Sequence, residues 1–153
     1  SVIAFYEDVL AKVIALAVFL PIISDMSGCS GNQAIAVSIR ELSLGLIKPR
    51  DFLRVLLQES KMGVINGLGV GIVLFAIVFL WKGSLFLALV VGAALWTNTL
   101  ASTALGGVFP LILNRLRVDP ALAAAPILTT ITDMLGFFLS LSFAAIALSF
   151  GQL

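Results

Sequence analysis

The sequence predicts an all-α protein, a polytopic transmembrane helix bundle with four spanning helices and one short amphipathic helix. Composition is the first reason: 61% of the 153 residues are hydrophobic and 11% are charged, whereas soluble domains carry roughly 25% charged residues. The second reason is that the apolar residues gather in four stretches long enough to cross a bilayer. With a mean hydropathy of +1.18, residues 1–153 read as a single transmembrane domain in a cell (inner) membrane.

The first apolar stretch, residues 9–45, would be roughly 55 Å long as one helix, nearly twice the hydrocarbon thickness. Pro21, followed by SDMSGCSGNQ, favours a kink or an unwound turn, because proline removes a helical hydrogen bond. The chain opens without an initiator Met or a basic leader. We therefore expect it to be a piece of a longer protein, with residues 1–6 as the tail of a preceding helix.

Residues 48–61, KPRDFLRVLLQESK, have an apolar stripe opposed by charged side chains. This pattern predicts a short amphipathic helix at the membrane surface, with Pro49 in its first turn. The alternative is an ordinary solvated connector.

Three further spans are expected at residues 62–80, 84–113 and 121–150. In the first of these, Gly63, Gly67 and Gly71 repeat every four residues and predict close helix packing, within one subunit or between subunits. The next span carries hydroxyl and amide side chains that serve either structure or pore lining. These are Thr97, Asn98, Thr99, Ser102 and Thr103.

Orientation follows from the basic residues that flank the spans. The segments before the second and fourth spans are basic, and the opposite side has only Lys82 between spans. The positive-inside rule therefore puts the 48–61 and 115–117 segments in the cytosol and both termini outside.

Asp133 is an ionisable residue deep within the last apolar stretch, which has no other charge between its ends. A carboxylate at that depth is costly, so it usually faces a bundle interior or a water-filled path. Thr129, Thr130 and Gly136 share its helix face, which we expect to meet a cation. The plainer alternative is a protonated Asp bonded to a neighbouring helix.

A second candidate site lies between Asp25 and Gln33. On a helix, Asp25, Gly28 and Asn32 form one polar strip that Ala36 continues; if the backbone is unwound, its free carbonyls become further oxygen ligands. In a structural alternative, Asp25 and Arg40 serve tertiary ion pairing and the glycines serve packing. Cys29 is expected to be a small buried residue.

Two motifs then suggest a family. P-x6-G-x-x-G-N-Q occupies residues 21–33, and D-P-A-L-A-x-x-P-x-x-T-x-x-x-D occupies residues 119–133. With the amphipathic segment between them, nearly the whole chain resembles the membrane domain of the MgtE family of magnesium transporters. The resemblance implies that the four spans are helices two to five of a five-helix domain, in a homodimer with a pore on its axis.

By position, the resemblance makes Asp133 the central acid of the pore and Thr129 its neighbour one turn earlier. It also implies that Asn32, Gly28 and adjacent residues line the path. The chain departs from the family at Cys29, where many relatives have Asn, and at Asp25, where many have a small residue. The resemblance further implies cytosolic regulatory domains in the parent protein.

The expected function is passive, channel-like movement of Mg²⁺, the transported ion, through the bilayer. A hydrated Mg²⁺ suits a pore with few carboxylates, since it prefers oxygen and loses its water reluctantly. A proton- or sodium-coupled carrier using the same acids and a non-transporting membrane anchor are the alternatives. The net charge of +1 gives no support to nucleic-acid binding, and no nucleophile–base pair or metal-ligand spacing indicates an enzyme.

Overall fold

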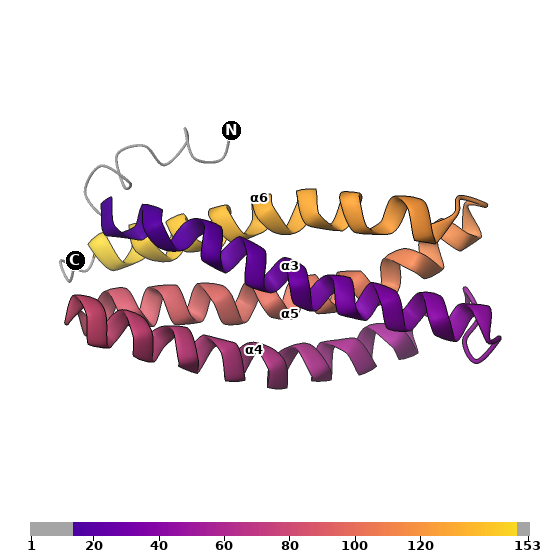
Figure 1. Cartoon of the computed structure of the whole chain (residues 1–153), viewed down its shortest axis with the longest axis horizontal. Helices are drawn as coiled ribbons and strands as arrows, with labels where there is room; N and C mark the ends of the chain where they lie inside the picture. The colour runs from indigo at the N-terminus through magenta and orange to yellow at the C-terminus, as the bar shows by residue number, and fades with distance from the viewer. Residues whose placement is uncertain (1–13, 150–153) are drawn as a thin grey trace.

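The computed structural model describes residues 14–149, which form four long helices and no strand. They are α3 (Ile14–Ser43), α4 (Phe52–Lys82), α5 (Leu85–Arg115) and α6 (Pro120–Ser149). Each has 30 or 31 residues, about 45 Å of helix, and Figure 1 shows them running roughly along one long axis. The tail predicted at residues 1–6 lies outside the described residues.

Three of the helices, α4, α5 and α6, are long and apolar enough to cross a membrane. The helix α3 is as long but carries a polar stretch from Ser24 to Gln33. The structure therefore supports an all-helical bundle with three clear candidate spans among the described residues, and the predicted fourth span rests on α3.

The unwound turn predicted after Pro21 is wrong, while a kink there stays a prediction. The helix α3 is continuous through Pro21, so Asp25 and Asn32 lie on regular helix and the unwound alternative is also wrong. A proline removes only one backbone donor, and the side chains on both sides of it are held by packing. Leu16, Phe19, Leu20 and Ile23 are all buried in the core that α5 and α6 complete.

The structure also shows no separate amphipathic helix at residues 48–61. Pro49 precedes the helix, and residues 52–61 are the first turns of α4, which continues to Lys82 without interruption. The reason is packing: Val55 is buried against Ile47 and Leu111, so the inner side of this segment faces α5 and not a membrane surface.

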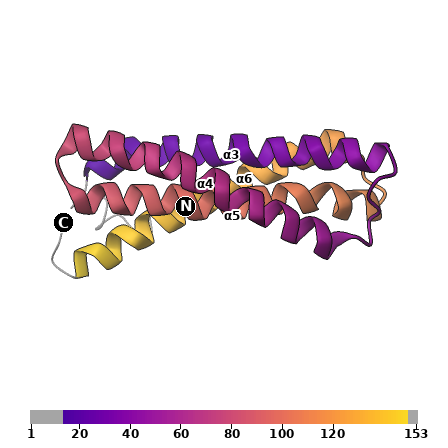
Figure 2. The ribbon, with the colours of Figure 1, turned by 90° about the horizontal axis from the view of Figure 1, so that it is seen from below.

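The helix α5 is the centre of the bundle and contacts α3, α4 and α6. Figure 2 shows α4 crossing α5 obliquely, and a tight turn joins the two. Gly83 adopts φ 67° and ends α4, while the Ser84 hydroxyl accepts a hydrogen bond from the Leu87 amide at 3.2 Å and caps α5.

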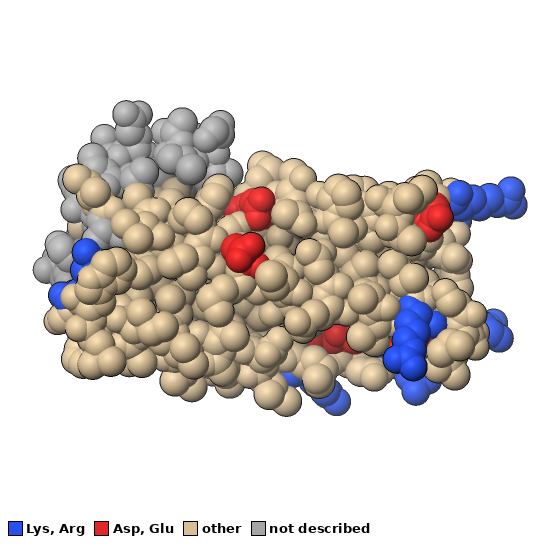
Figure 3. All heavy atoms as spheres, viewed as in Figure 1, with Lys and Arg blue, Asp and Glu red and all other residues tan. Residues whose placement is uncertain are grey.

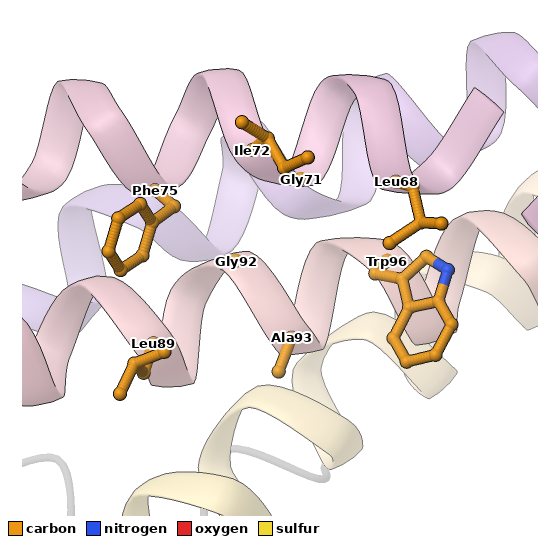
Figure 4. A pocket seen from close by; sticks show the side chains of 8 residues that line it. All are labelled: Leu68, Gly71, Ile72, Phe75, Leu89, Gly92, Ala93 and Trp96. Carbon is orange, nitrogen blue, oxygen red and sulfur yellow. The ribbon is translucent and has the colours of Figure 1, made fainter. Parts of the chain in front are cut away.

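Glycines make these close contacts possible. A Cβ added at Gly67 would lie 3.0 Å from the Trp96 carbonyl, and one at Gly71 would lie 3.0 Å from the Gly92 carbonyl. The ridge of Gly63, Gly67 and Gly71 therefore packs against α5 within one subunit, which settles the two alternatives for it. Beside Gly71 and Gly92 the helices leave an apolar groove of about 280 Å³ (Figure 4).

Three apolar clusters are buried in the described part of the bundle: a large one near the 83–84 turn, and two smaller ones toward the opposite end. Between the large cluster and the two smaller ones lies a layer of buried polar side chains contributed by α3, α5 and α6. Its members are Ser24, Ser27, Ser30, Asn98, Thr99, Ser102, Thr103, Thr132 and Ser140.

Charge is distributed unevenly along the bundle. In Figure 3 most Lys and Arg atoms lie toward one end, while acidic side chains also appear near the middle of the long axis, surrounded by uncharged atoms. The basic end is the one that carries the 44–51 and 116–119 connections, and Lys82 lies at the other end.

Candidate functional site

A groove of about 330 Å³ runs between α3 and α6, and all five residues proposed from the sequence line it. Asp25, Gly28 and Asn32 contribute from α3, and Thr129 and Asp133 contribute from α6. The lining is completed by Pro21, Ser24, Cys29 and Phe137.

Helical spacing explains the groove. Residues three or four apart share one face of a helix, so Asp25, Gly28 and Asn32 point to the same side of α3. Thr129 and Asp133 stand in the same relation on α6. The sequence therefore predicted both walls once the segments were recognised as helices.

Asp133 is half-buried, and the hydroxyl of Ser24 donates a hydrogen bond to its Oδ1. The bond to a neighbouring helix that the plainer alternative expects is thus present, and Asp133 is exposed to the groove as well. Ser24 was not among the proposed site residues. The sequence could have indicated Ser24, because it lies four residues before Gly28 and next to Asp25 and therefore on the lining face of α3.

Asp25 is exposed in the groove. Arg40 lies in the last turn of α3, and neither it nor Asp25 forms an ion pair within the described part of the chain, so the tertiary ion pairing of the structural alternative is not found there. Within residues 14–149, therefore, neither acid of the groove is neutralised by Lys or Arg, and both carboxylates are available to a cation.

The neighbours predicted for Asp133 divide into two groups. Thr129 lines the groove and donates its hydroxyl to the Ala125 carbonyl at 3.0 Å, which leaves its oxygen lone pairs free to accept. Thr130 is exposed outside the groove lining, and Gly136 is buried against α5. The expectation that Thr130 and Gly136 face the cation is therefore wrong.

The residues beside the α3 strip also divide. Cys29 is exposed in the groove, so the prediction of a buried cysteine is wrong; its position on the open face of α3 decides this. Ser30 and Gln33 instead line a separate polar groove of about 480 Å³ toward α4, where the Asn66 amide donates to the Ser30 hydroxyl at 3.4 Å.

The polar residues of α5 serve structure. Thr97 donates to the Ala93 carbonyl at 2.8 Å, and Thr103 donates to the Thr99 carbonyl at 2.7 Å. Asn98, Thr99 and Ser102 are fully buried, and α5 contributes no residue to the α3–α6 groove. Of the two alternatives for this span, the geometry favours a structural role over pore lining.

Oxygen dominates the chemistry of the groove. It presents two carboxylates, two hydroxyls and one amide side chain, which are ligands that hard cations prefer. The described residues contain no group of three or more His, Cys, Asp or Glu side chains suited to holding a metal ion. The arrangement therefore suits a cation that keeps most of its water and touches the wall through it.

The family model and the relatives that match this chain all carry the same family name. A family model described as "MgtE: Divalent cation transporter" matches residues 20–143. The "Magnesium transporter MgtE" of Thermus thermophilus is 35% identical over 148 residues, 97% of this chain and 33% of that protein. The proteins of the same name from Bacillus subtilis and Enterococcus faecalis are 34% and 31% identical over 91% and 88% of this chain. The chain spans about a third of the length of these curated relatives.

Proposed function

Because this chain belongs to the MgtE family of divalent cation transporters, we propose that it carries Mg²⁺ passively along a path whose oxygen ligands line the α3–α6 groove. Family membership and three long apolar helices make it a multi-pass membrane protein. The observation that carries the proposal is that Asp25 and Asp133, from two different helices, face one groove.

The ion enters this path largely hydrated. Mg²⁺ favours octahedral oxygen coordination and dehydrates reluctantly, so two carboxylates and a few neutral oxygens act through its water shell. Thr129 and Asn32 supply neutral oxygens at the same groove. Gly28 contributes no side chain, and an added Cβ there would meet only the Thr132 hydroxyl, at 3.9 Å. In this proposal, the missing side chain at Gly28 leaves space in the groove for a hydrated ion.

A second copy of the chain completes the pore in this proposal. In one subunit the groove opens at the surface, and two carboxylates facing lipid would be costly. A two-fold axis along the groove covers it and doubles the number of carboxylates to match divalent charge. Light scattering in detergent should give the mass of a dimer, and a monomer at every concentration would rule this assembly out.

In the same proposal α3 is the fourth spanning helix. Its polar residues from Ser24 to Asn32 lower its mean hydropathy, but those of the lining face water in the groove and not lipid. The basic end of the bundle, with Lys48 and Arg115, lies in the cytosol.

Ion flux into liposomes tests the function. The protein should move Mg²⁺ down its gradient without a pH or sodium gradient, and Mn²⁺, Co²⁺ and Ca²⁺ measured alongside give the ion ranking. A flux that requires a proton or sodium gradient would favour the coupled carrier. If a protein in which Asp25 and Asp133 are both replaced by Asn gives the same flux as the parent, the membrane anchor is favoured. The measured signal would then come from leakage of the liposomes.

A further inference from the structure

One fully buried amide lies directly behind the groove. Asn98, on the central helix α5, has an exposed fraction of 0%. Its Nδ2 donates to the Ser27 hydroxyl on α3 at 2.5 Å and to the Thr132 carbonyl on α6 at 3.2 Å. A single side chain therefore joins the two helices that form the groove walls.

Both partners are next to groove residues. Ser27 precedes Gly28 and lies one turn after Ser24, whose hydroxyl bonds Asp133. Thr132 directly precedes Asp133. A shift of either partner relative to Asn98 would therefore change the separation of the walls at the level of the acid.

The chain makes room for this amide. A Cβ added at Gly136 would lie 2.6 Å from Asn98 Nδ2, closer than side-chain carbons approach. A side chain at position 136 would therefore displace the Asn98 amide from its place against α6. This accounts for a glycine on the face of Asp133 that the ion proposal alone did not use.

Ser27 and Thr132 do not depend on the Asn98 amide for their hydrogen bonds. The Ser27 hydroxyl already donates to the Ile23 carbonyl at 2.8 Å and contacts the Ser24 carbonyl at 3.0 Å, and Thr132 lies within a continuous helix. Asn98 Oδ1 is itself buried without a hydrogen-bond partner among the described residues, which is an unfavourable state. A leucine, which has the same branching and the same number of side-chain heavy atoms, would remove this unsatisfied acceptor.

We propose that Asn98 is a positioning residue of the ion path: it holds α3 and α6 at the separation at which the Asp133 carboxylate and the α3 oxygens meet one hydrated divalent cation. The inference rests on the function proposed above. It predicts that Asn98→Leu weakens ion binding while the free energy of unfolding stays the same or improves. If Asn98 served only the stability of the fold, Asn98→Leu would lower the free energy of unfolding and leave ion binding nearly unchanged.

Cys29 offers a native reporter, because it is the single cysteine of the chain and is exposed in the groove. The rate at which a cationic methanethiosulfonate modifies Cys29 is measured in detergent while Mg²⁺ is titrated. The Mg²⁺ concentration that halves this rate reports occupancy of the groove. Thermal unfolding of the same samples reports stability.

In Asn98→Leu the half-protecting Mg²⁺ concentration should rise about ten- to a hundredfold, the usual range when support behind a metal ligand is lost. Ser27→Ala, a change too small to threaten folding, should also raise the half-protecting Mg²⁺ concentration. The double variant Asn98→Leu with Ser27→Ala should raise it little more than the larger single change does, because the two side chains form one hydrogen bond. Thr99→Val is the matched control. Thr99 is a buried α5 side chain whose hydroxyl also lacks a partner in the described chain, and it is not in the groove.

A half-protecting concentration within twofold of the parent for both Asn98→Leu and Ser27→Ala would overturn the proposal, as would an equal rise in Thr99→Val. A parent in which Mg²⁺ never protects Cys29 would contradict the ion groove instead. The role of Asn98 is then judged by spin labels at Cys29 on α3 and at Met134→Cys, an exposed position on α6 next to Asp133. Asn98→Leu should broaden their distance distribution, and an unchanged distribution would refute the positioning role.

Discussion

Replacing Asp133 by Asn separates the charge of the carboxylate from its shape. The amide has nearly the same size, and its oxygen can still accept the hydrogen bond from the Ser24 hydroxyl. The contact between α3 and α6 therefore persists, and the free energy of unfolding should change little. Only the attraction for a cation is lost.

The size of that loss follows from Coulomb's law. For a hydrated divalent ion about 5 Å from the carboxylate, the attraction is about 2 kcal/mol at the dielectric constant of water and about 7 kcal/mol at an effective value of 20. Asp133 is half-buried, so the effective dielectric lies between these limits. The lower figure already corresponds to more than a tenfold loss of affinity.

The assay pairs Mg²⁺ uptake in a strain that lacks other magnesium transporters with thermal unfolding in detergent. Asp133→Asn should reduce uptake at low Mg²⁺ at least tenfold and leave the unfolding temperature nearly unchanged. Asp51→Asn is the matched control, because the Asp51 carboxylate accepts from the Lys48 amide outside the groove. If Asp133→Asn supports growth at low magnesium as well as the parent, the assignment of Asp133 to the ion path is wrong.

Three further changes test other parts of the reasoning. Asp25→Asn should lower the apparent Mg²⁺ affinity by no more than about fivefold, since an exposed charge contributes up to ~1 kcal/mol; an unchanged concentration dependence of flux would make Asp25 structural. Gly106→Ala should destabilise the fold by about 1–3 kcal/mol in thermal or denaturant unfolding, because its Cβ would overlap the Gly31 carbonyl. Gly69→Ala, with nothing within 4 Å, should be neutral or stabilising, and equal losses at both glycines would refute the packing argument. Arg54→Cys in a cysteine-free background should react with impermeant reagents only from the cytosolic side, and labelling from outside would invert the orientation.

The helices and the groove residues could be predicted from the sequence because both follow from periodicity. Apolar length located the spans, with boundaries close to those of α5 and α6. The three- and four-residue spacing of Asp25, Gly28 and Asn32 identified one wall, and the depth of Asp133 identified the other. These are local patterns, so they are visible without knowledge of the fold.

The errors arose where tertiary contacts outweigh local signals. Pro21 is a strong helix breaker by itself, but buried neighbours on both sides hold α3 continuous. The 48–61 segment has the pattern of a surface helix, yet Val55 packs against α5 and merges it into α4. Gly136 shares a face with Asp133, but which neighbour meets that glycine depends on Asn98, far away in the sequence. A single sequence does not reveal such pairs.

The position of the two acids along the bundle has an electrical consequence. Asp25 and Asp133 lie near the middle of α3 and α6, so in the proposed path an ion held between them would have crossed about half of the membrane. Moving one charge through the whole field is worth about 2.3 kcal/mol per 100 mV, so a divalent ion at half depth gains about the same amount. Occupancy of the groove from the outer side should therefore change by a factor of about fifty per 100 mV. If Asp25 and Asp133 hold the ion as proposed, its binding would also depend on the membrane voltage.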